Sequence, residues 1–331
     1  MSEAVECGAS SEVTWQLGPS TMYGTLVKPL GDGPFPAVVM VAGSGTTDRD
    51  WDSPLLPGTN GSARLLAEEL ACAGIASLRY DKRASGPHVA ENLPTLIGKI
   101  SMAAHVDELA GAIHLLADQP FVRDDRIFAL GNSEGTLHAM SYQIADPAIP
   151  LAGLVLAAPP GRAVGTVARC QLAEQAAAIP NGEALLSLYD ASIVRFLAGQ
   201  PADPDPLLPE GVQMLLRSLE TPANLPFARE LWVADGAALL AQVDVPVLVI
   251  IGKKDIQVDW HADGEPLRRA AAGREQVTFL FPDNANHVLK YEPLAREELN
   301  AVDAQNRYNA DDARLDPDSS SAIVEWLIAH N

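Results

Sequence analysis

Ser133 is the side chain of this sequence best placed for covalent chemistry. It lies at the centre of the pentapeptide GNSEG, residues 131–135, between an apolar run at 126–130 and a segment with a helical pattern. Glycines on both sides allow a sharp turn from strand to helix, which leaves the serine hydroxyl clear of the backbone. A hydroxyl held in this way can attack a carbonyl carbon. The pentapeptide alone also fits an ordinary turn in which serine caps the helix.

An acid and a histidine follow Ser133 along the chain, each shortly after an apolar run. Asp255 follows the run at 245–251, and His287 follows the run at 277–281. A nucleophilic serine needs a base to take its proton and a carboxylate to orient that base and stabilise its cationic form. The pattern therefore predicts Ser133 as the nucleophile, His287 as the general base and Asp255 as the orienting acid.

Two other carboxylates lie close to these positions in the sequence. Asp259 is an alternative orienting acid, but Asp255 stands closer to the end of the preceding apolar run. Asp283 precedes His287 by four residues, and we expect it to shape the histidine loop. Asp255 is therefore the preferred acid.

The chain order of the three residues is that of the serine α/β-hydrolases, and the sequence resembles this family over nearly its whole length. The segment VAGSGTTDRD at 41–50 resembles the Gly-rich loop after the third strand of these enzymes, and LRYDKRASG at 78–86 resembles the loop after the next strand. Residues 307–317 resemble the approach to the terminal helix in bacterial esterase-like members. Ala42 and Asn132 depart from the commonest family pattern, in which histidine is frequent at both positions.

The resemblance implies both a fold and a chemistry. The fold is an α/β-hydrolase fold, with a mostly parallel eight-stranded sheet flanked by helices and a helical cap inserted after the sixth strand. The chemistry is that of a serine hydrolase, a carboxylesterase that cleaves esters of small or medium acyl substrates through an acyl-enzyme intermediate. The backbone N–H groups of Ser44 and Glu134 are expected to form the oxyanion hole. No metal or organic cofactor is implied.

Other activities remain open at this point. Thioesterases, lactonases, amidases or peptidases and C–C bond hydrolases use the same triad on the same fold. The alternative of another class is a non-catalytic protein of this fold that binds a small ligand. The intact set of Ser133, Asp255 and His287 favours an enzyme.

Apolar runs and helical stripes place these residues on an alternating framework. Segments 13–17 and 22–28 are typical of an antiparallel hairpin, and continuous apolar runs indicate buried parallel strands at 36–41, 75–80, 126–130, 151–157, 245–251 and 277–281. Strand signals stop between 159 and 244, where helical stripes flank the proline-rich stretch 201–209. We predict a hydrolase core at 1–158 and 245–331 and a cap at 159–244 that covers the serine. The alternative is a surface excursion with no role in the site.

Composition restricts the partners. The chain has 331 residues and a formal net charge of −20, which argues against a nucleic-acid or anionic-membrane surface. No apolar stretch reaches the length of a membrane span, and residues 1–7 lack the pattern of a signal peptide. We therefore expect a cytoplasmic protein whose partner is a small-molecule acyl substrate. The oligomeric state is not indicated.

The three cysteines are far apart and odd in number, so the sequence predicts neither a disulfide framework nor a metal site. Cys72 falls in a helical apolar pattern and is expected to be a small buried side chain. Among the histidines, His88 is the one alternative to His287 that we weigh as a pocket residue. His105, His114 and His138 lie in helical segments and are expected to be packed or exposed side chains, and His261 and His330 surface residues.

Two charged clusters lie in the loops at 48–50 and 81–83. A basic group here could recognise an acidic substrate. We favour the structural interpretation, in which Arg49 and Asp81 pair and brace two adjacent loops, because oppositely charged neighbours of this kind usually serve the fold.

Overall fold

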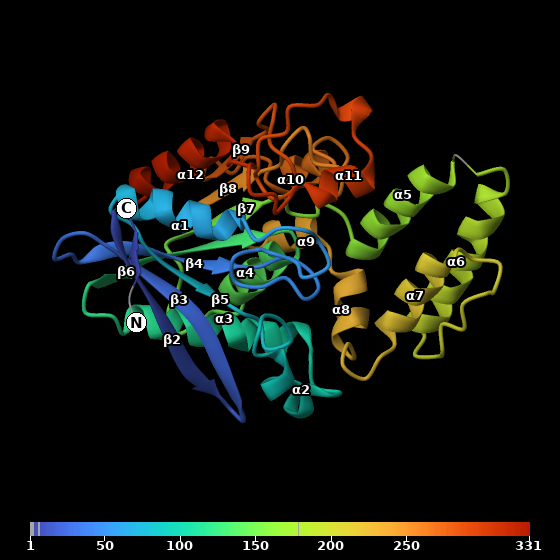
Figure 1. Cartoon of the computed structure of the whole chain (residues 1–331), viewed down its shortest axis with the longest axis horizontal. Helices are drawn as coiled ribbons and strands as arrows, with labels where there is room; N and C mark the ends of the chain where they lie inside the picture. The colour runs from blue at the N-terminus through green and yellow to red at the C-terminus, as the bar shows by residue number, and fades with distance from the viewer. Residues whose placement is uncertain (1–2, 6, 178) are drawn as a thin grey trace.

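The structure is a computed structural model that describes residues 3–5, 7–177 and 179–331. Residues 1, 2, 6 and 178 lie outside this description. The prediction that residues 1–7 form no signal peptide therefore falls partly on residues that are not described. The described residues form one sheet of nine strands in the order β1-β2-β3-β5-β4-β6-β7-β8-β9 (Figure 1). Its strands are β1 (Glu3–Val5), β2 (Gly8–Leu17), β3 (Ser20–Pro29), β4 (Phe35–Val41), β5 (Ala76–Tyr80), β6 (Val122–Asn132), β7 (Gly153–Ala157), β8 (Val247–Ile250) and β9 (Val277–Leu280).

The sheet confirms the predicted mostly parallel arrangement of strands. Strands β4 to β9 run parallel, whereas β1, β2 and β3 are antiparallel to their neighbours. The eight predicted strands correspond to β2–β9, and the three-residue β1 adds a ninth at the edge. Because β5 and β6 lie on opposite sides of β4, the order of the parallel strands reverses there, and the carboxyl ends of β4 and β6 border a crevice.

Helices cover both faces of the sheet because successive strand residues point to opposite sides. Val38 and Met40 pack with helices α1 (Ser62–Cys72) and α12 (Pro317–Ala329). Val39 packs on the other face, which is covered by helices α3 (Met102–Ala117), α4 (Glu134–Ile144), α9 (Gly236–Leu240) and α10 (Gly264–Ala270). Two further helices, α2 (Val89–Leu96) and α11 (Ala301–Asn306), and the short 3₁₀ helix at Arg296–Glu298 lie in the connections.

The chain between β7 and β8 is helical throughout its regular parts. Before α9 it forms α5 (Val164–Ala176), α6 (Gly182–Leu197), α7 (Glu210–Leu219) and α8 (Phe227–Val233), and its described residues contain no strand. Figure 1 shows α5, α6 and α7 beside the sheet rather than on either face. Phe196 and Trp232 belong to an apolar cluster separate from the two on the sheet. The proline-rich stretch 201–209 has no regular element, as its composition predicts.

A disulfide joins Cys7 to Cys72, so the prediction that the cysteines form no disulfide is wrong. Cys72 is the last residue of α1 and is exposed, not buried. The pairing of β2 with β3 carries Cys7 to the end of α1, across a sequence separation of 65 residues. Helical periodicity places Cys72 on a helix but cannot show which distant segment meets the helix end.

In the part of the chain that the structure describes, no helix combines the length and the apolar composition needed to cross a bilayer. The cytoplasmic location stays a prediction.

Candidate active site

Ser133 occupies a strained turn between β6 and α4. Its backbone angles are φ 53° and ψ −120°, a combination that residues other than glycine rarely adopt. Its side chain makes no capping hydrogen bond to the helix, which rules out the interpretation of Ser133 as an ordinary helix cap. The backbone N–H of Ser133 instead donates to Ala157 O at 2.8 Å and fixes the turn to β7.

The two flanking glycines allow β4, β6 and α4 to approach closely. A Cβ atom at Gly131 would lie 2.6 Å from the backbone of Gly135, and one at Gly135 would lie 2.4 Å from Val41 O. Neither glycine has a positive φ, so the turn uses them for space, and the strained conformation falls on the serine itself. The sequence predicted the sharp turn correctly but placed the conformational freedom on the wrong residues.

His287 and Asp255 form a buried pair at the ends of the last two strands. His287 Nδ1 lies 2.8 Å from Asp255 Oδ2, and the Asp255 side chain is fully buried. The other carboxylate oxygen accepts the backbone N–H groups of residues 257–258 at 2.7 and 3.0 Å. Asp259 bonds Arg296 instead. The structure therefore pairs the histidine with Asp255 and leaves the outer ring nitrogen, Nε2, for other partners.

Two cavities border both Ser133 and His287. One has a volume of about 250 Å³ and is lined further by Trp51 and Tyr308. The other has a volume of about 150 Å³ and extends beneath Val167 from the helical segment. In the described structure no hydrogen bond joins the Ser133 hydroxyl to the imidazole. Catalytic hydrogen bonds in unliganded enzymes are often long and tighten only when substrate binds.

Two backbone N–H groups stand beside Ser133. That of Glu134 begins α4, where the helix offers it no acceptor. The N–H of Ser44 makes no hydrogen bond in the described residues, and Ser44 itself lies in the loop after β4 and lines both cavities. The close approach of this loop depends on Gly43, where a Cβ atom would lie 3.3 Å from Asn132 Oδ1. The five predicted site residues thus lie together at the crevice, and their roles stay predictions.

Comparison with known proteins identifies the family. Residues 38–300 match the family model described as alpha/beta hydrolase family. The chain belongs to this family. It is 29% identical over 268 residues to esterase EstD of Thermotoga maritima, across 80% of this chain and 57% of that protein. The chain therefore spans a little over half the length of that relative.

Solved structures of other alpha/beta hydrolases share the fold. The proline iminopeptidase of Mycobacterium smegmatis superposes with a TM-score of 0.56 and 14% identity, over 97% of this chain and 98% of that one. Est1E of Butyrivibrio proteoclasticus, solved with ferulic acid bound, gives a TM-score of 0.56 and 13% identity, over 96% and 98% of the two chains. At these identities the likeness concerns the fold alone.

Lys82, a buried lysine from the charged cluster at 81–83, lies behind Ser133 in this alpha/beta hydrolase. Lys82 Nζ donates to Gly43 O at 2.6 Å and to Glu134 Oε1 at 3.0 Å. Both charged side chains are almost fully buried. Burial would raise the pKa of Glu134, but the Lys82 ammonium and a hydrogen bond from His138 outweigh it and hold that pKa well below its usual range. Glu134 is therefore a carboxylate.

Two histidines extend this cluster. Burial lowers the pKa of His138 to about 4 despite its contact with Glu134 at 3.1 Å, so the imidazole is neutral at pH 7. The ring of His105 lies 4.7 Å from that of His138, and its Nδ1 is 3.0 Å from Glu108. Burial would raise the pKa of Glu108, but its pKa falls to about 2 because His105 and Arg83 face it.

The same cluster contains donors suited to a metal ion. One ligand atom from each of His105, Glu134 and His138 lies within 4.8 Å of the others. A cation there would compete with the Lys82 ammonium, which already neutralises Glu134. The spacings Glu134–His138 and His105–Glu108, at i,i+4 and i,i+3, were the available sequence signal, because they bring side chains together on a helix.

Asn132 and Tyr308 support the histidine. Asn132 Nδ2 donates to His287 O at 3.0 Å, which ties the turn at Ser133 to the histidine loop. The Tyr308 ring stacks beside the imidazole with a centroid separation of 6.3 Å. The departure of Asn132 from the family pattern was the sequence signal, but its meaning depends on a contact across 155 residues.

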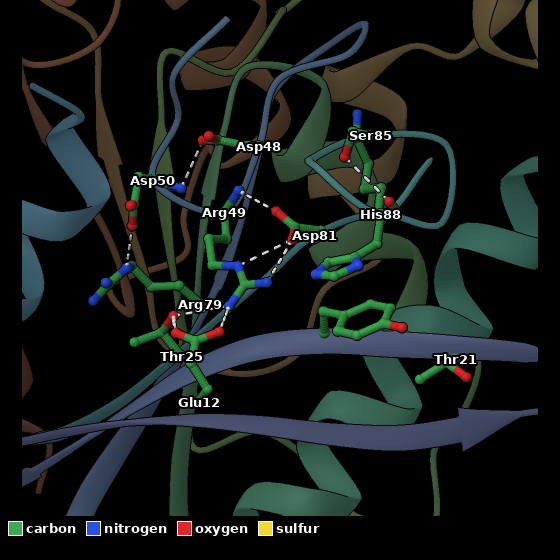
Figure 2. A network of polar contacts seen from close by, with 12 residues as sticks. Glu12, Thr21, Thr25, Asp48, Arg49, Asp50, Arg79, Asp81, Ser85 and His88 are labelled. Carbon is green, nitrogen blue, oxygen red and sulfur yellow. Dashed lines mark hydrogen bonds and ion pairs between the residues drawn. The ribbon is translucent and has the colours of Figure 1, made fainter. Parts of the chain in front are cut away.

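The predicted pair between Arg49 and Asp81 is present and braces the loop after β4. Figure 2 shows the guanidinium between Asp81 and Glu12, with Arg49 Nη2 at 2.7 Å from Asp81 Oδ2 and Nη1 at 2.6 Å from Glu12 Oε2. Burial alone would lower the pKa of Arg49, but the hydrogen bonds and the charge of Asp81 outweigh burial and raise that pKa. His88 stacks on Tyr23 at 3.7 Å between ring centroids and lines neither cavity. Figure 2 also shows that a second pair, Arg79 with Asp50, holds the same loop.

Proposed function

We propose that this chain is a serine carboxylesterase that cleaves esters of small or medium acyl substrates through an acyl-enzyme intermediate. One observation supports this most strongly: Ser133, in a strained turn, borders the same two cavities as His287, whose imidazole is paired with the buried Asp255. Strain of this kind persists only where the surrounding structure enforces it and is concentrated at functional sites. The likeness to an esterase of Thermotoga maritima points the same way.

The geometry supports a definite division of labour. Ser133 attacks the ester carbonyl while His287 accepts its proton and then returns it to the leaving alcohol. Asp255 holds the imidazole with Nδ1–H inward and stabilises the cation that forms. The N–H groups of Ser44 and Glu134 receive the oxyanion of the tetrahedral intermediate. Water then attacks the acyl-enzyme. His287 takes a proton from the water and passes it to the Ser133 oxygen as the carboxylic acid leaves.

The helical segment 159–244 acts as the cap in this proposal. It has its own apolar cluster, and it contributes Val164, Val167 and Leu231 to the wall of the smaller cavity. That cavity, at about 150 Å³, has room for about five groups the size of a water molecule. We therefore assign the smaller cavity to a short acyl group and the larger one to the alcohol.

Replacement of Ser133 by alanine tests the function. Wild type should hydrolyse p-nitrophenyl acetate and butyrate and should gain the mass of one fluorophosphonate adduct. Ser133→Ala should lose both activities, with a residual rate reduced by about 10⁶-fold or to the detection limit. Ser187→Ala, an exposed serine in α6, is the matched control and should behave as wild type.

Two outcomes would contradict the proposal. Labelling that survives in Ser133→Ala would place the nucleophile elsewhere. A wild-type protein that binds small esters without turning them over would favour the non-catalytic alternative. The substrate panel should include thioesters, lactones and amides, because the same triad serves them and one structural neighbour is an iminopeptidase.

A further inference from the structure

The Lys82 ammonium contacts the backbone unit that supplies one of the proposed oxyanion donors. Gly43 O, which accepts from Lys82 Nζ at 2.6 Å, belongs to the peptide group whose N–H is that of Ser44. A trans peptide is planar, and its C=O and N–H bonds point in opposite directions. Holding the carbonyl toward Lys82 therefore directs the Ser44 N–H away from the lysine, and Ser44 lines both cavities.

The same ammonium reaches the second proposed donor through a side chain. Lys82 Nζ lies 3.0 Å from Oε1 of Glu134, whose own backbone N–H is the other donor beside Ser133. The lysine thus bridges the loop after β4 and the first turn of α4. Both side chains of this ion pair are at most 5% exposed, so water does not screen the contact.

A charge-assisted hydrogen bond also changes the peptide that accepts it. Donation to the carbonyl oxygen polarises the peptide and strengthens its N–H as a donor, as in other chains of hydrogen bonds. A neutral side chain of the same length would provide neither the orientation nor the polarisation. The benefit is largest when negative charge develops on the oxyanion, because the donor is aimed at that charge.

We infer that Lys82 is a positioning residue for the oxyanion hole: it fixes and polarises the Gly43–Ser44 peptide and ties it to Glu134. This inference rests on the proposed function and deepens it. Lys82 lines neither cavity, so it acts through the two backbone groups rather than by direct contact. Its removal should therefore affect turnover more than substrate binding.

Three variants test the inference with p-nitrophenyl butyrate as the probe. Lys82→Met should lower kcat roughly 10- to 100-fold, less than the 10²- to 10³-fold loss for deletion of an oxyanion donor, and change KM less than about threefold. The double variant Lys82→Met/Glu134→Gln removes both charges and leaves no unpaired buried carboxylate. It should regain much of the lost thermal stability but keep the low kcat.

Arg83→Met is the matched control. Arg83 is the next residue of the same loop and forms an ion pair with buried Glu108 at 2.7 Å, but it contacts neither Gly43 nor Glu134. Its kcat should stay within about threefold of wild type, because Arg83 reaches the Lys82–Glu134 pair only indirectly, through Glu108, His105 and His138. An unchanged kcat in Lys82→Met, recovery of kcat in the double variant, or an equal loss in Arg83→Met would overturn the inference.

Failure of the proposed function is recognised separately. If Ser133→Ala still hydrolyses the ester, the proposed nucleophile is wrong, and kcat no longer reports on the oxyanion hole. Crystal structures of wild type and the double variant then decide the geometric inference. A reoriented Gly43–Ser44 peptide in the double variant supports it, and an unchanged peptide overturns it.

Discussion

The sheet core and the helical segment 159–244 bury different kinds of side chain. The core encloses charged groups such as Lys82, Glu134 and Asp255, each almost completely buried. Among the described residues of the helical segment, only Ser192 and Tyr189 bury a polar side-chain group to this extent, and neither is charged. The cluster inside the segment is built from apolar and aromatic residues such as Phe196 and Trp232.

The two regions therefore differ in what they provide: the core holds charged groups in place, and the helical segment provides apolar surface. Buried charges need fixed partners, and a parallel sheet with short loops provides them with little freedom to move. An apolar helical cluster has no such requirement and can change its contour at low cost, because hydrophobic contacts are not directional. All seven histidines of the chain lie outside 159–244, in keeping with this division.

The contrast is tested most severely by one guanidinium–carboxylate pair from each region. Arg49→Met would leave Asp81 buried and unpaired, so we expect a loss of about 3 to 5 kcal/mol in the free energy of unfolding. Arg169 makes an equally short two-point contact with Asp190 in the helical segment, but these side chains are 47% and 39% exposed. Arg169→Met should cost nothing measurable.

Urea unfolding of both variants provides the measurement, with the urea dependence (m value) checked to be unchanged. A substantial loss in Arg169→Met, or none in Arg49→Met, would show that burial does not distinguish the regions in the way proposed. Gln substitutions at the same two positions serve as controls for the loss of the long side chain.

The buried His138 should make stability depend on pH. The pKa of His138 is lowered from 6.5 to about 4 by burial, so between these values the unfolded chain binds more protons than the folded one. Above pH 6.5 the imidazole is neutral in both states, and His138 does not make stability depend on pH. As the pH falls from 6.5 toward 4, the free energy of unfolding decreases because only the unfolded chain takes up the proton. The corresponding contribution of Glu108, whose pKa is lowered to about 2, is lost only below about 4.5.

Asp52 acts in the opposite direction. Burial and the neighbouring acids raise its pKa from 3.8 to about 7, so its contribution weakens as the pH rises through that range. We therefore expect the decisive measurement to be a difference between proteins. The loss of stability from pH 7.5 to 5 should be smaller in His138→Gln than in wild type, by about 1 to 2 kcal/mol. Equal losses of stability in the two proteins would show that His138 does not cause the pH dependence.

The smallest expected effect concerns the shape of the helical segment. Val167→Trp would fill the smaller cavity and should shift the kcat/KM preference from butyrate toward acetate esters by about tenfold. Val194→Trp, at an exposed position of α6 that lines neither cavity, is the matched control. An unchanged preference in a folded Val167→Trp protein would remove the role of the segment as a cap.

Much of the framework could be predicted from local patterns. The strands at 36–41 and 277–281 and the strand-free helical segment follow from continuous apolar runs and helical stripes, which are local properties of the sequence. The pair of His287 with Asp255 could be anticipated because each residue follows a strand of the same sheet. The Arg49–Asp81 pair followed from the expected proximity of neighbouring loops.

Other features needed contacts between distant segments. The Cys7–Cys72 bond joins residues 65 positions apart, and no local pattern indicates that they meet. The role of Asn132 depends on its hydrogen bond to the backbone of His287. The conformation of Ser133 could not be predicted from the sequence, because the turn places the positive φ on the serine and not on Gly131 or Gly135.

By itself the sequence predicted the alternation of strands and helices and the three candidate side chains for the nucleophile, base and acid. These depend on residue type and spacing, which are fixed along the chain. Only the tertiary structure decided that Lys82 meets both Gly43 O and Glu134. A buried charge takes its partners from whatever the fold brings within hydrogen-bonding distance, and that is a property of three-dimensional packing.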